Sequence, residues 1–373
     1  ENERTKAQKG DIFFTSVGSL GRSCVYDGSL NICFQRSVSV ISTLIFNYYL
    51  KYFFDCGYYQ QKIVSEATGT AQKGFYLNQL SNSLIPVPPF SEQKRIVNKI
   101  DSLLPHIRMY DSYYYELGKL QLEFPEKLRK SILQQAVMGK LVPQDSNDEP
   151  ASILLERIRA EKEQLIKSGK IKRDKHESII FRRDNSYYEK LDGIERCIDD
   201  EILFEIPENW IWVRVGNIFE HNTGKALNSS NTSGIMLEYI TTSNLYWNRF
   251  ELDKLKQMYF KTTEIDKCTV TKGDLLICEG GDIGRAAIWD YDYDMRIQNH
   301  IHRLRPFRPL NVKFFYYLFY YYKNIGMIGG KGIGIQGLSS NTLHNILFPF
   351  PPILEQDRIV ESIENIFFII ERL

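Results

Sequence analysis

A long internal repeat constrains the fold of this chain more than any other feature. The segment IPVPPFSEQKRIVNKI at residues 85–100 returns as FPFPPILEQDRIVESI at residues 348–363, a shift of 263 positions. Further matches at this shift are Lys9–Ile12 with Lys272–Leu275, Gly21-Arg22 with Gly284-Arg285, Gln35 with Gln298, and Asn78, Leu80 and Asn82 with Asn341, Leu343 and Asn345. A constant register over so many residues indicates a duplicated module, far longer than the repeats of a solenoid.

The two copies are of unequal extent within this sequence. Glu1 falls opposite Glu264, and Leu373 falls opposite Tyr110. We therefore expect a chain trimmed at both ends, or one built from a permuted or recombined gene, and the sequence leaves these origins open.

Each copy combines strand and helix patterns. GDIFFTSV and GDLLICEG are short apolar runs that follow a Lys-Gly turn, and SCVYD and RAAIWD follow Gly-Arg. The aromatic runs FNYYLKYFFDCGYY and VKFFYYLFYYYKNIG are too long for ordinary strands and predict buried helices. The fold class we expect is α+β, with residues 207–350 forming one domain and residues 1–90 forming part of its twin.

After each Pro-Pro pair the apolar spacing changes to alternating fours and threes. The first seam is Ile96, Ile100, Leu103, Ile107, Tyr110, Tyr114, Leu117 and Phe124, and the second is Ile359, Ile363, Ile366, Ile370 and Leu373. Two matched seams favour long helices that pack on each other as a coiled coil, while a single amphipathic helix buried on its own domain is the alternative. Glu92 and Glu355 suit the first helical turn, Pro105 is expected to kink the first helix, and Pro125 is expected to end or restart it.

A further helix is expected in EPASILLERIRAEKEQLIKSGKIKRDK, ending at Gly169. The residues around and after its end form the most basic stretch of the chain: Lys167, Lys170, Lys172, Arg173, Lys175, Arg182 and Arg183. This stretch is either a solvated helix face or a surface that contacts phosphates.

Composition excludes several protein classes. The 373 residues carry a net charge of +1, so a nucleic-acid partner would have to be met by local patches. The six cysteines form no C-x-x-C pair, so neither a disulfide scaffold nor a zinc site is expected. We expect buried thiols in a reducing cytoplasm instead. Without a long apolar span or a basic-then-apolar leader, we expect a soluble, cytoplasmic protein that does not enter a membrane.

Catalytic motifs are missing from the sequence. Amino-methyltransferases use a polar residue before Pro-Pro, but Val87 and Phe350 occupy that place here. The glycine-rich stretch around Lys331 lacks the spacing of a phosphate loop, and neither H-E-x-x-H nor G-x-S-x-G occurs. His300 and His302 have strand spacing but no cysteine partners nearby, so a metal site there is not favoured.

Polar loops take the place of catalytic motifs. TGKALNSSNTSG (223–234), TTSN (241–244), RIQNH (296–300) and IQGLSSN (335–341) are rich in side chains that can bond to base edges or phosphates. Each loop alone is an ordinary turn, but their recurrence in a duplicated module favours readout of DNA.

The run SILQQAVMGKLVPQDSNDEPASILLERIRAEKEQLIKSGKIKRDK, followed by IPENWIWVRVGNI, resembles the central region of type I restriction–modification specificity subunits. KGDLLI, GDIGRAAI, QNH and PPILEQDRI resemble their target-recognition modules. The resemblance implies two pseudo-repeated target-recognition domains joined by long antiparallel coiled-coil helices, each domain reading one half of a split double-stranded DNA target. It implies no catalysis and no cofactor in this chain: S-adenosylmethionine would bind the methyltransferase (modification) subunits, and ATP and magnesium would bind the restriction subunits.

The resemblance also implies boundaries and sites. The expected divisions are 1–90 (part of the first recognition domain), 91–145 (first spacer helix), 146–206 (second helical segment and basic linker), 207–352 (second recognition domain) and 353–373 (start of the second spacer helix). The expected DNA contacts are Lys225, Asn228, Ser229, Thr241, Thr242, Ser243, Asn244, Gln298, Asn299 and Gln336, and in the first domain Arg22, Gln35, Arg36, Gln72 and Lys73. Gly284 and Arg285 are expected to shape a turn, and the outward faces near Glu92–Arg108 and Leu128–Val142 are expected to dock methyltransferase subunits.

Three functions stay open at this point. The first is a non-catalytic DNA-specificity subunit, the second is an enzyme such as a fused methyltransferase or nuclease, and the third is a coiled-coil interaction protein or a recombination cassette without DNA-reading activity of its own.

Overall fold

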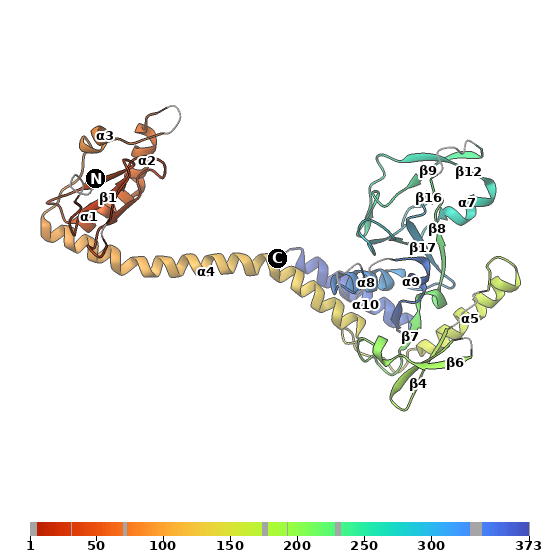
Figure 1. The fold of residues 1–373 in the computed structure, drawn as a ribbon. Helices are drawn as coiled ribbons and strands as arrows, with labels where there is room; N and C mark the ends of the chain where they lie inside the picture. Colours follow the sequence, from red (N-terminus) through yellow and green to blue (C-terminus); the bar gives the residue numbers. More distant parts are fainter. Residues whose placement is uncertain are drawn as a thin grey trace. The chain divides into compact units, whose positions relative to one another are not determined.

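The computed structural model of the chain describes residues 6–30, 32–69, 73–173, 178–191, 193–227, 233–328 and 338–372. The chain divides into two compact units, residues 1–120 (unit 1) and residues 121–373 (unit 2), each drawn in Figure 1. Both units combine helices with antiparallel strands, which confirms the mixed helix-and-strand character expected from the sequence.

Unit 1 is a three-stranded antiparallel sheet with helices. The strands lie in the order β2 (Ser23–Val25), β1 (Ile12–Thr15) and β3 (Val38–Ile41). The helices are α1 (Asn47–Asp55), α2 (Gly57–Glu66), α3 (Leu77–Ser81) and the first part of α4 (Phe90–Val137). Along β1, Ile12 and Phe14 are fully buried in a core with residues of α1 and α2, while their neighbours are half-buried. Successive side chains of a strand point to opposite faces, so this alternation of buried and half-buried residues shows that the sheet buries one face.

Unit 2 holds two four-stranded sheets. The first has the order β15 (Ala286–Ile288), β14 (Leu275–Cys278), β17 (Ile301–Pro306) and β8 (Phe219–Thr223). The second has the order β12 (Lys256–Phe260), β9 (Ile235–Ile240), β16 (Met295–Ile297) and β13 (Thr269–Val270). In this sheet β9 and β16 run parallel, and the other two neighbouring pairs are antiparallel. Strand β14 lies between two cores, since Leu275 and Ile277 join one cluster and Leu276 and Cys278 join another. A strand buried on both faces needs a continuous apolar run, as LLIC supplies.

Smaller elements complete unit 2. The remaining strands form the sheet β4 (Ser178–Arg183), β5 (Ser186–Leu191) and β6 (Ile194–Cys197), the pair β7 (Ile211–Arg214) and β18 (Leu347–Phe350), and the pair β10 (Leu245–Tyr246) and β11 (Arg249–Phe250). The helices are α5 (Ala151–Lys167), α6 (Val215–Ile218), α7 (Thr262–Cys268), α8 (Val312–Asn324), α9 (Ser340–His344) and α10 (Ile353–Ile370), with a 3₁₀ turn at Asp199–Glu201.

The sequence repeat is a structural repeat inside the two units. Shifted by 263 positions, β1, β2 and α3 coincide in bounds with β14, β15 and α9. Asp11 accepts a hydrogen bond from the backbone of Gln8 at 2.7 Å, and Asp274 accepts one from Thr271 at 2.8 Å. Both carboxylates are buried. Through these equivalent hydrogen bonds, each caps the turn before its strand in the same way.

The Pro-Pro segments are also alike in structure. The buried side chain of Gln93 donates to the Pro88 carbonyl at 2.8 Å, and that of Gln356 donates to the Pro351 carbonyl at 3.0 Å. This amide satisfies a backbone group at the proline that precedes each helix, so the repeated glutamine fixes how the helix leaves its domain.

The aromatic runs are helical in both units. The second run forms α8, whose Phe314, Phe315, Phe319 and Tyr322 are buried, as predicted. The first run is divided into α1 and α2, because Cys56 between them has an extended backbone.

Helix α4 corrects one prediction. The helix is continuous from Phe90 to Val137, so the expectation that Pro125 ends or restarts it is wrong. Proline removes one backbone hydrogen bond, and the turns after it are held by packing, since Leu133, Ala136 and Val137 are buried in the main core of unit 2. For the same reason the inner side of Leu128–Val142 is not available for docking.

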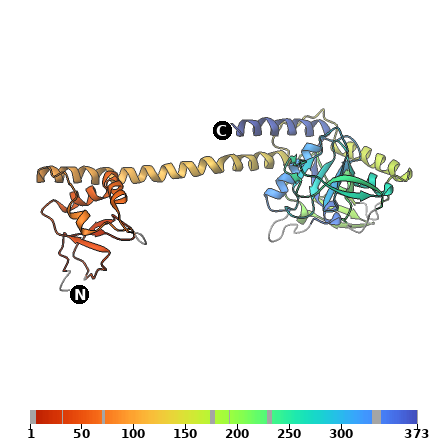
Figure 2. The same cartoon turned by 90° about the horizontal axis from the view of Figure 1, so that it is seen from above.

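The two predicted seams differ in their surroundings. In unit 2, Ile359, Ile363 and Ile370 of α10 are buried, and Figures 1 and 2 show α10 beside the last turns of α4, running in the opposite direction. Arg129 of α4 lies over the Phe367 ring at 5.7 Å, in agreement with this packing. In unit 1, the seam residues from Leu103 to Leu117 are exposed, so a coiled-coil partner for them stays a prediction.

The cysteines correct a second prediction. Cys268 and Cys278 are buried as expected, but Cys24, Cys33 and Cys197 are exposed and Cys56 is half-buried.

Candidate nucleic-acid interface

Three of the predicted polar loops meet at one end of the sheet that contains β9 and β16. The Lys225 amide donates to the Ile297 carbonyl at 3.1 Å, and the Asn299 amide donates to the Lys225 carbonyl at 3.0 Å. The Gln298 amide donates to the Ile240 carbonyl at 3.0 Å, directly before the TTSN turn. The structure therefore brings the predicted residues of all three loops together, although they are far apart in the sequence.

A glycine makes this meeting possible. A Cβ atom on Gly224 would lie 1.9 Å from the Ile297 carbonyl oxygen, closer than any real contact. Only glycine lets the chain after β8 cross the end of β16 at this distance. The glycine of the TGK triplet thus positions Lys225 beside Gln298.

Lys225 itself is held inside the protein. Its ammonium group donates to the Tyr259 carbonyl at 2.9 Å and forms an ion pair with Glu264 at 2.6 Å. The side chain is only 12% exposed. These contacts tie α7 to the loop, so the first role of Lys225 is structural, and its contact with DNA stays a prediction.

The TTSN turn divides into an inner and an outer half. The Asn244 carboxamide oxygen accepts from the Thr241 amide at 2.9 Å and from the Thr241 hydroxyl at 2.8 Å, and its nitrogen donates to the Glu251 carbonyl at 2.9 Å. Both side chains are buried, so they build the turn. Ser243 is exposed, although its hydroxyl lies 2.7 Å from the Thr241 hydroxyl, and Thr242 is half-buried, so these are the two side chains of the turn that a partner can reach.

Arg285 holds the backbone of this turn by a hydrogen bond. Its guanidinium donates to the Thr242 carbonyl at 2.6 Å and lies 4.9 Å from the centre of the Tyr246 ring. Gly284 before it has a φ of +83°, a value that favours glycine. The prediction that Gly284 and Arg285 shape a turn and anchor the fold is confirmed.

The RIQNH loop presents the remaining candidates. Gln298 and Asn299 are half-buried, and the Gln298 carboxamide bonds to no side chain or backbone group in the part of the chain that the structure describes. An amide that is partly exposed and uncommitted can bond to a base edge. His300, in the same loop, is exposed and lies 3.5 Å from the Glu279 carboxylate.

Unit 1 places its candidates at the equivalent end of its own sheet. Arg22 precedes β2, Gln35 and Arg36 precede β3, and Lys73 precedes Gly74, which pairs with Val17 beyond the end of β1. All four side chains are exposed. The 263-residue shift maps Arg22, Gln35 and Arg36 onto Arg285, Gln298 and Asn299, so the two units present the same end of related sheets.

Some predicted contacts lie outside the described residues. They are Gln72, Asn228, Ser229 and Gln336.

A chain of three histidines was not predicted from the sequence. His221 Nε2 lies 2.8 Å from His302 Nδ1, and His344 Nε2 lies 2.9 Å from His221 Nδ1. Burial and the neighbouring His302 lower the pKa of His221 to about 3, so its ring is neutral near pH 7. Only the strand spacing of His300 and His302 hinted at a buried histidine. The described part of the chain contains no group of three or more His, Cys, Asp or Glu side chains that could hold a metal ion.

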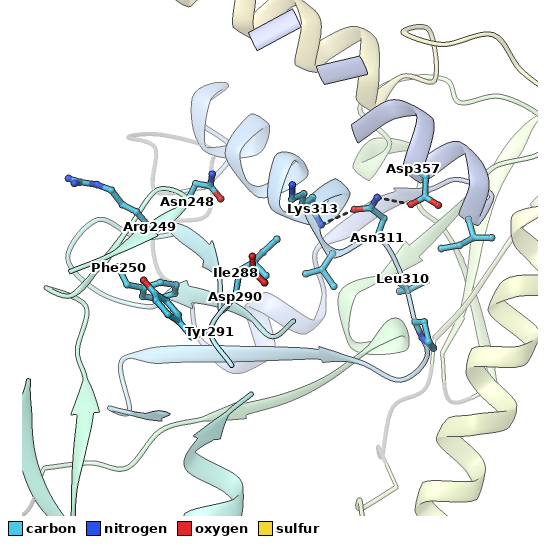
Figure 3. A pocket seen from close by; sticks show the side chains of 13 residues that line it. Asn248, Arg249, Phe250, Ile288, Asp290, Tyr291, Leu310, Asn311, Lys313 and Asp357 are labelled. Carbon is cyan, nitrogen blue, oxygen red and sulfur yellow. Dashed lines mark hydrogen bonds between the residues drawn. The ribbon is translucent and has the colours of Figure 1, made fainter. Parts of the chain in front are cut away.

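A separate pocket of ≈ 930 Å³ lies where β11 and the end of β15 meet the starts of α8 and α10 (Figure 3). The carboxamide of Asn311 donates to Asp357 at 2.7 Å, and the ammonium group of Lys313 pairs with Glu364 at 2.6 Å. Its lining residues include two cations, Arg249 and Lys313, and two carboxylates, Asp290 and Asp357. They supply neither a nucleophile–base pair nor a set of metal ligands.

None of the helices that the structure describes is long and apolar enough to cross a membrane.

Comparison with known proteins agrees with this geometry. Residues 1–108 and 207–372 match the family described as "Type I restriction modification DNA specificity domain". The EcoAI specificity subunit of Escherichia coli is 27% identical over 353 residues, covering 81% of this chain and 56% of that protein. The EcoEI specificity subunit of Escherichia coli is 30% identical over 279 residues, covering 69% of this chain and 41% of that protein. This chain thus spans about half the length of these relatives.

Among solved structures, the HsdS subunit from Thermoanaerobacter tengcongensis aligns with a TM-score of 0.47 and 18% identity. The alignment covers 98% of this chain and 75% of that one.

Proposed function

Because the chain belongs to the type I restriction–modification DNA specificity family, we propose that it reads a bipartite double-stranded DNA target, one half with each unit. One observation carries the proposal: the two units present polar side chains at the same end of related sheets, near Gln35 in unit 1 and near Gln298 in unit 2. A duplicated reader suits a target with two halves, and Asn, Gln and Arg side chains suit base edges.

The proposal assigns no chemical step to this chain. The pocket and the loops supply positioning and hydrogen bonding, and methyl transfer would come from methyltransferase subunits that bind S-adenosylmethionine. ATP and magnesium would act on restriction subunits that join the same complex, which we place in the cytoplasm. The exposed face of α4 around Glu92–Arg108 is the docking surface we propose for the methyltransferase.

The helix α4 would act as the spacer between the two readers. Its continuity from Phe90 to Val137 supports this role. Inserting or deleting residues within 96–124 would then change the spacing between the DNA half-sites and leave each half-site unchanged.

A selectivity measurement tests the proposal. The target is found by mapping methylated motifs in a host with and without the gene, and the full chain is assembled with its methyltransferase. Fluorescence anisotropy then compares the target duplex with a scrambled duplex of equal length and base composition at one salt concentration. We expect the target to bind at least about 10³-fold more tightly. Equal binding of the two duplexes refutes the proposal.

A second candidate is supported by the exposed seam. Apolar side chains from Leu103 to Leu117 are solvent-exposed within unit 1, as expected of an interaction helix. A chain that pairs through this seam but never selects a DNA sequence would be a coiled-coil interaction protein or a recombination cassette. Methyl transfer by the purified chain alone would instead revive the enzyme hypothesis.

A further inference from the structure

A second cleft of unit 2, ≈ 780 Å³ in volume, lies between the end of α5, α7, α9 and the strands β8 and β17 (labelled in Figure 1). Its lining residues include six basic side chains: Lys162, Lys170, Lys172, Lys267, Arg303 and Arg305. The pocket near α8 described above is electrically balanced, whereas this one concentrates positive charge.

The charge of the cleft is far from that of the whole chain. Against six basic side chains, the lining contains two acidic ones, Glu220 and Asp266. His221 and His344 also line it, and the neutral ring of His221 adds no charge near pH 7. A local excess of four positive charges stands out in a protein whose net charge is +1.

The basic side chains on the floor of the cleft belong to the fold. Arg305 forms a two-pronged pair with Asp274, at 2.8 Å and 2.7 Å. Arg303 is buried, donates to the Thr269 carbonyl at 2.5 Å and lies 3.4 Å from Glu220. These guanidinium groups contribute field to the cleft but are committed to internal partners.

The lysines at the rim are different. Lys170, Lys172 and Lys267 are exposed, and none of them forms an ion pair or hydrogen bond through its side chain with any residue that the structure describes. Three ammonium groups that face a basic cleft repel one another, so an anion that bridges them would lower the electrostatic free energy.

Within the basic stretch, some side chains are paired with a carboxylate and others are not. Arg173 pairs with Glu163 at 2.7 Å through both terminal nitrogens, and Arg183 lies 3.1 Å from Glu195. Gly169 has a φ of +73°, and the Lys170 amide bonds back to the Leu165 carbonyl at 3.0 Å, as in a Schellman motif. This turn ends α5 and places Lys170 and Lys172 at the cleft, whereas Lys267 reaches it from α7.

We propose that this cleft binds a phosphate group through Lys170, Lys172 and Lys267. A phosphate carries up to two negative charges and several acceptor oxygens, so it can satisfy several ammonium donors at once, which a single carboxylate does less well. The group can come from the DNA backbone, a source that rests on the proposed function, or from a free phosphate compound.

The first arm of the test uses inorganic pyrophosphate. Isothermal titration calorimetry at low salt measures pyrophosphate binding by the wild-type full chain and by the triple variant K170Q/K172Q/K267Q. The matched control is K130Q/K140Q/K190Q, whose lysines are also exposed in unit 2 but do not line the cleft. We expect the cleft variant to bind at least about tenfold more weakly, because it loses three charge-assisted contacts, and the control to bind like the wild type. Equal affinity of the wild type and the cleft variant, or an equal loss in the control, overturns the proposal. Circular dichroism melting verifies that both variants fold.

The second arm identifies the source of the phosphate. A scrambled duplex without terminal phosphates is titrated into the same proteins over a range of salt concentrations. If the DNA backbone occupies the cleft, pyrophosphate competes with the duplex, and the slope of log K against log salt falls by roughly 0.9 for each lost contact in the cleft variant. Unchanged duplex binding, with pyrophosphate binding lost, keeps the phosphate site and overturns its assignment to DNA.

The outcome is separable from that of the proposed function. Phosphate contacts carry no sequence information, so the cleft variant should weaken target and scrambled duplexes by the same factor. If the wild-type complex binds both duplexes equally, the proposed function fails while the pyrophosphate arm still decides the cleft.

Discussion

Replacing Glu189 with glutamine tests the electrostatic account of unit 2 most directly. The buried Glu189 carboxylate accepts from Arg214 through both oxygens, each at 2.9 Å, from Arg196 at 2.6 Å and from Ser178 at 2.5 Å. Arg214 lies on β7, whereas Glu189 lies on β5. The carboxylate therefore fastens the sheet β4–β5–β6 to the strand pair β7–β18.

The magnitude follows from the titration of this group. Burial alone would raise the pKa of Glu189, but the hydrogen bonds from Arg214, Ser178 and Arg196 outweigh it and lower the pKa from 4.5 to about 2. This gap corresponds to about 3 kcal/mol of folding free energy at pH 7. Because the folded-state pKa is lowered, the contribution is present above pH 4.5 and is lost as the pH falls from there toward 2.

The assay can follow unit 2 alone. The four tryptophans of the chain are Trp210, Trp212, Trp247 and Trp289, and all lie in unit 2. Urea unfolding followed by tryptophan fluorescence should show E189Q to be less stable than the wild type by about 3 kcal/mol at pH 7. The difference should shrink by about 1.4 kcal/mol at pH 3.5, because only the wild type has this carboxylate to titrate.

A matched control separates burial from charge. Glu195 lies on the neighbouring strand, is exposed and pairs with Arg183 at 3.1 Å. E195Q should cost less than about 1 kcal/mol, since exposed ion pairs contribute little. A loss in E189Q no larger than in E195Q, or a difference that does not change with pH, would refute the reasoning.

Four other outcomes are expected. Gly224→Ala should lower both the stability of unit 2 and target selectivity, as measured by urea unfolding and by anisotropy, because its Cβ would overlap the Ile297 carbonyl; an unchanged stability would contradict this. Gln298→Ala in the assembled complex should weaken target binding about tenfold and leave scrambled binding unchanged; an equal effect on both would exclude base readout. Deletions within 96–124 should change the half-site spacing found by methylation mapping, and unchanged spacing in an active complex would exclude the spacer role. The His221 ring, whose pKa is lowered to about 3 by burial and by His302, should stay neutral at pH 5 in an NMR titration, and a charged ring at that pH would contradict its burial.

Much of the fold could be predicted from local patterns. The strands β1 and β14 were found because a Lys-Gly turn precedes a short apolar run in each copy, and α8 because its aromatic run exceeds the length of a strand. The error at Pro125 has the opposite origin. Local propensity disfavours proline inside a helix, and packing of the following turns in the core of unit 2 overrides it.

The candidate site shows where prediction from sequence stops. Lys225, Thr241 and Asn244 have the residue types of DNA contacts, yet the structure gives their side chains internal partners. Other members of the same loops, such as the exposed Ser243 and the half-buried Gln298, are polar residues of the same kind, and a partner can reach them. Composition cannot separate the two groups, because the difference lies in which neighbour each side chain meets.

By itself, the sequence determined the duplication, the turns that require glycine, the helix and strand periods and the family. All of these depend on residues close in the chain or on one constant shift. The tertiary structure decided which charges are free. Lys225 meets Glu264 on another element, Trp210 and Gln144 meet the buried Glu355 at the start of α10, and Lys170, Lys172 and Lys267 gather unpaired around one cleft. Pairing of charges depends on distances of a few ångströms between residues far apart in sequence, and only the folded chain sets those distances.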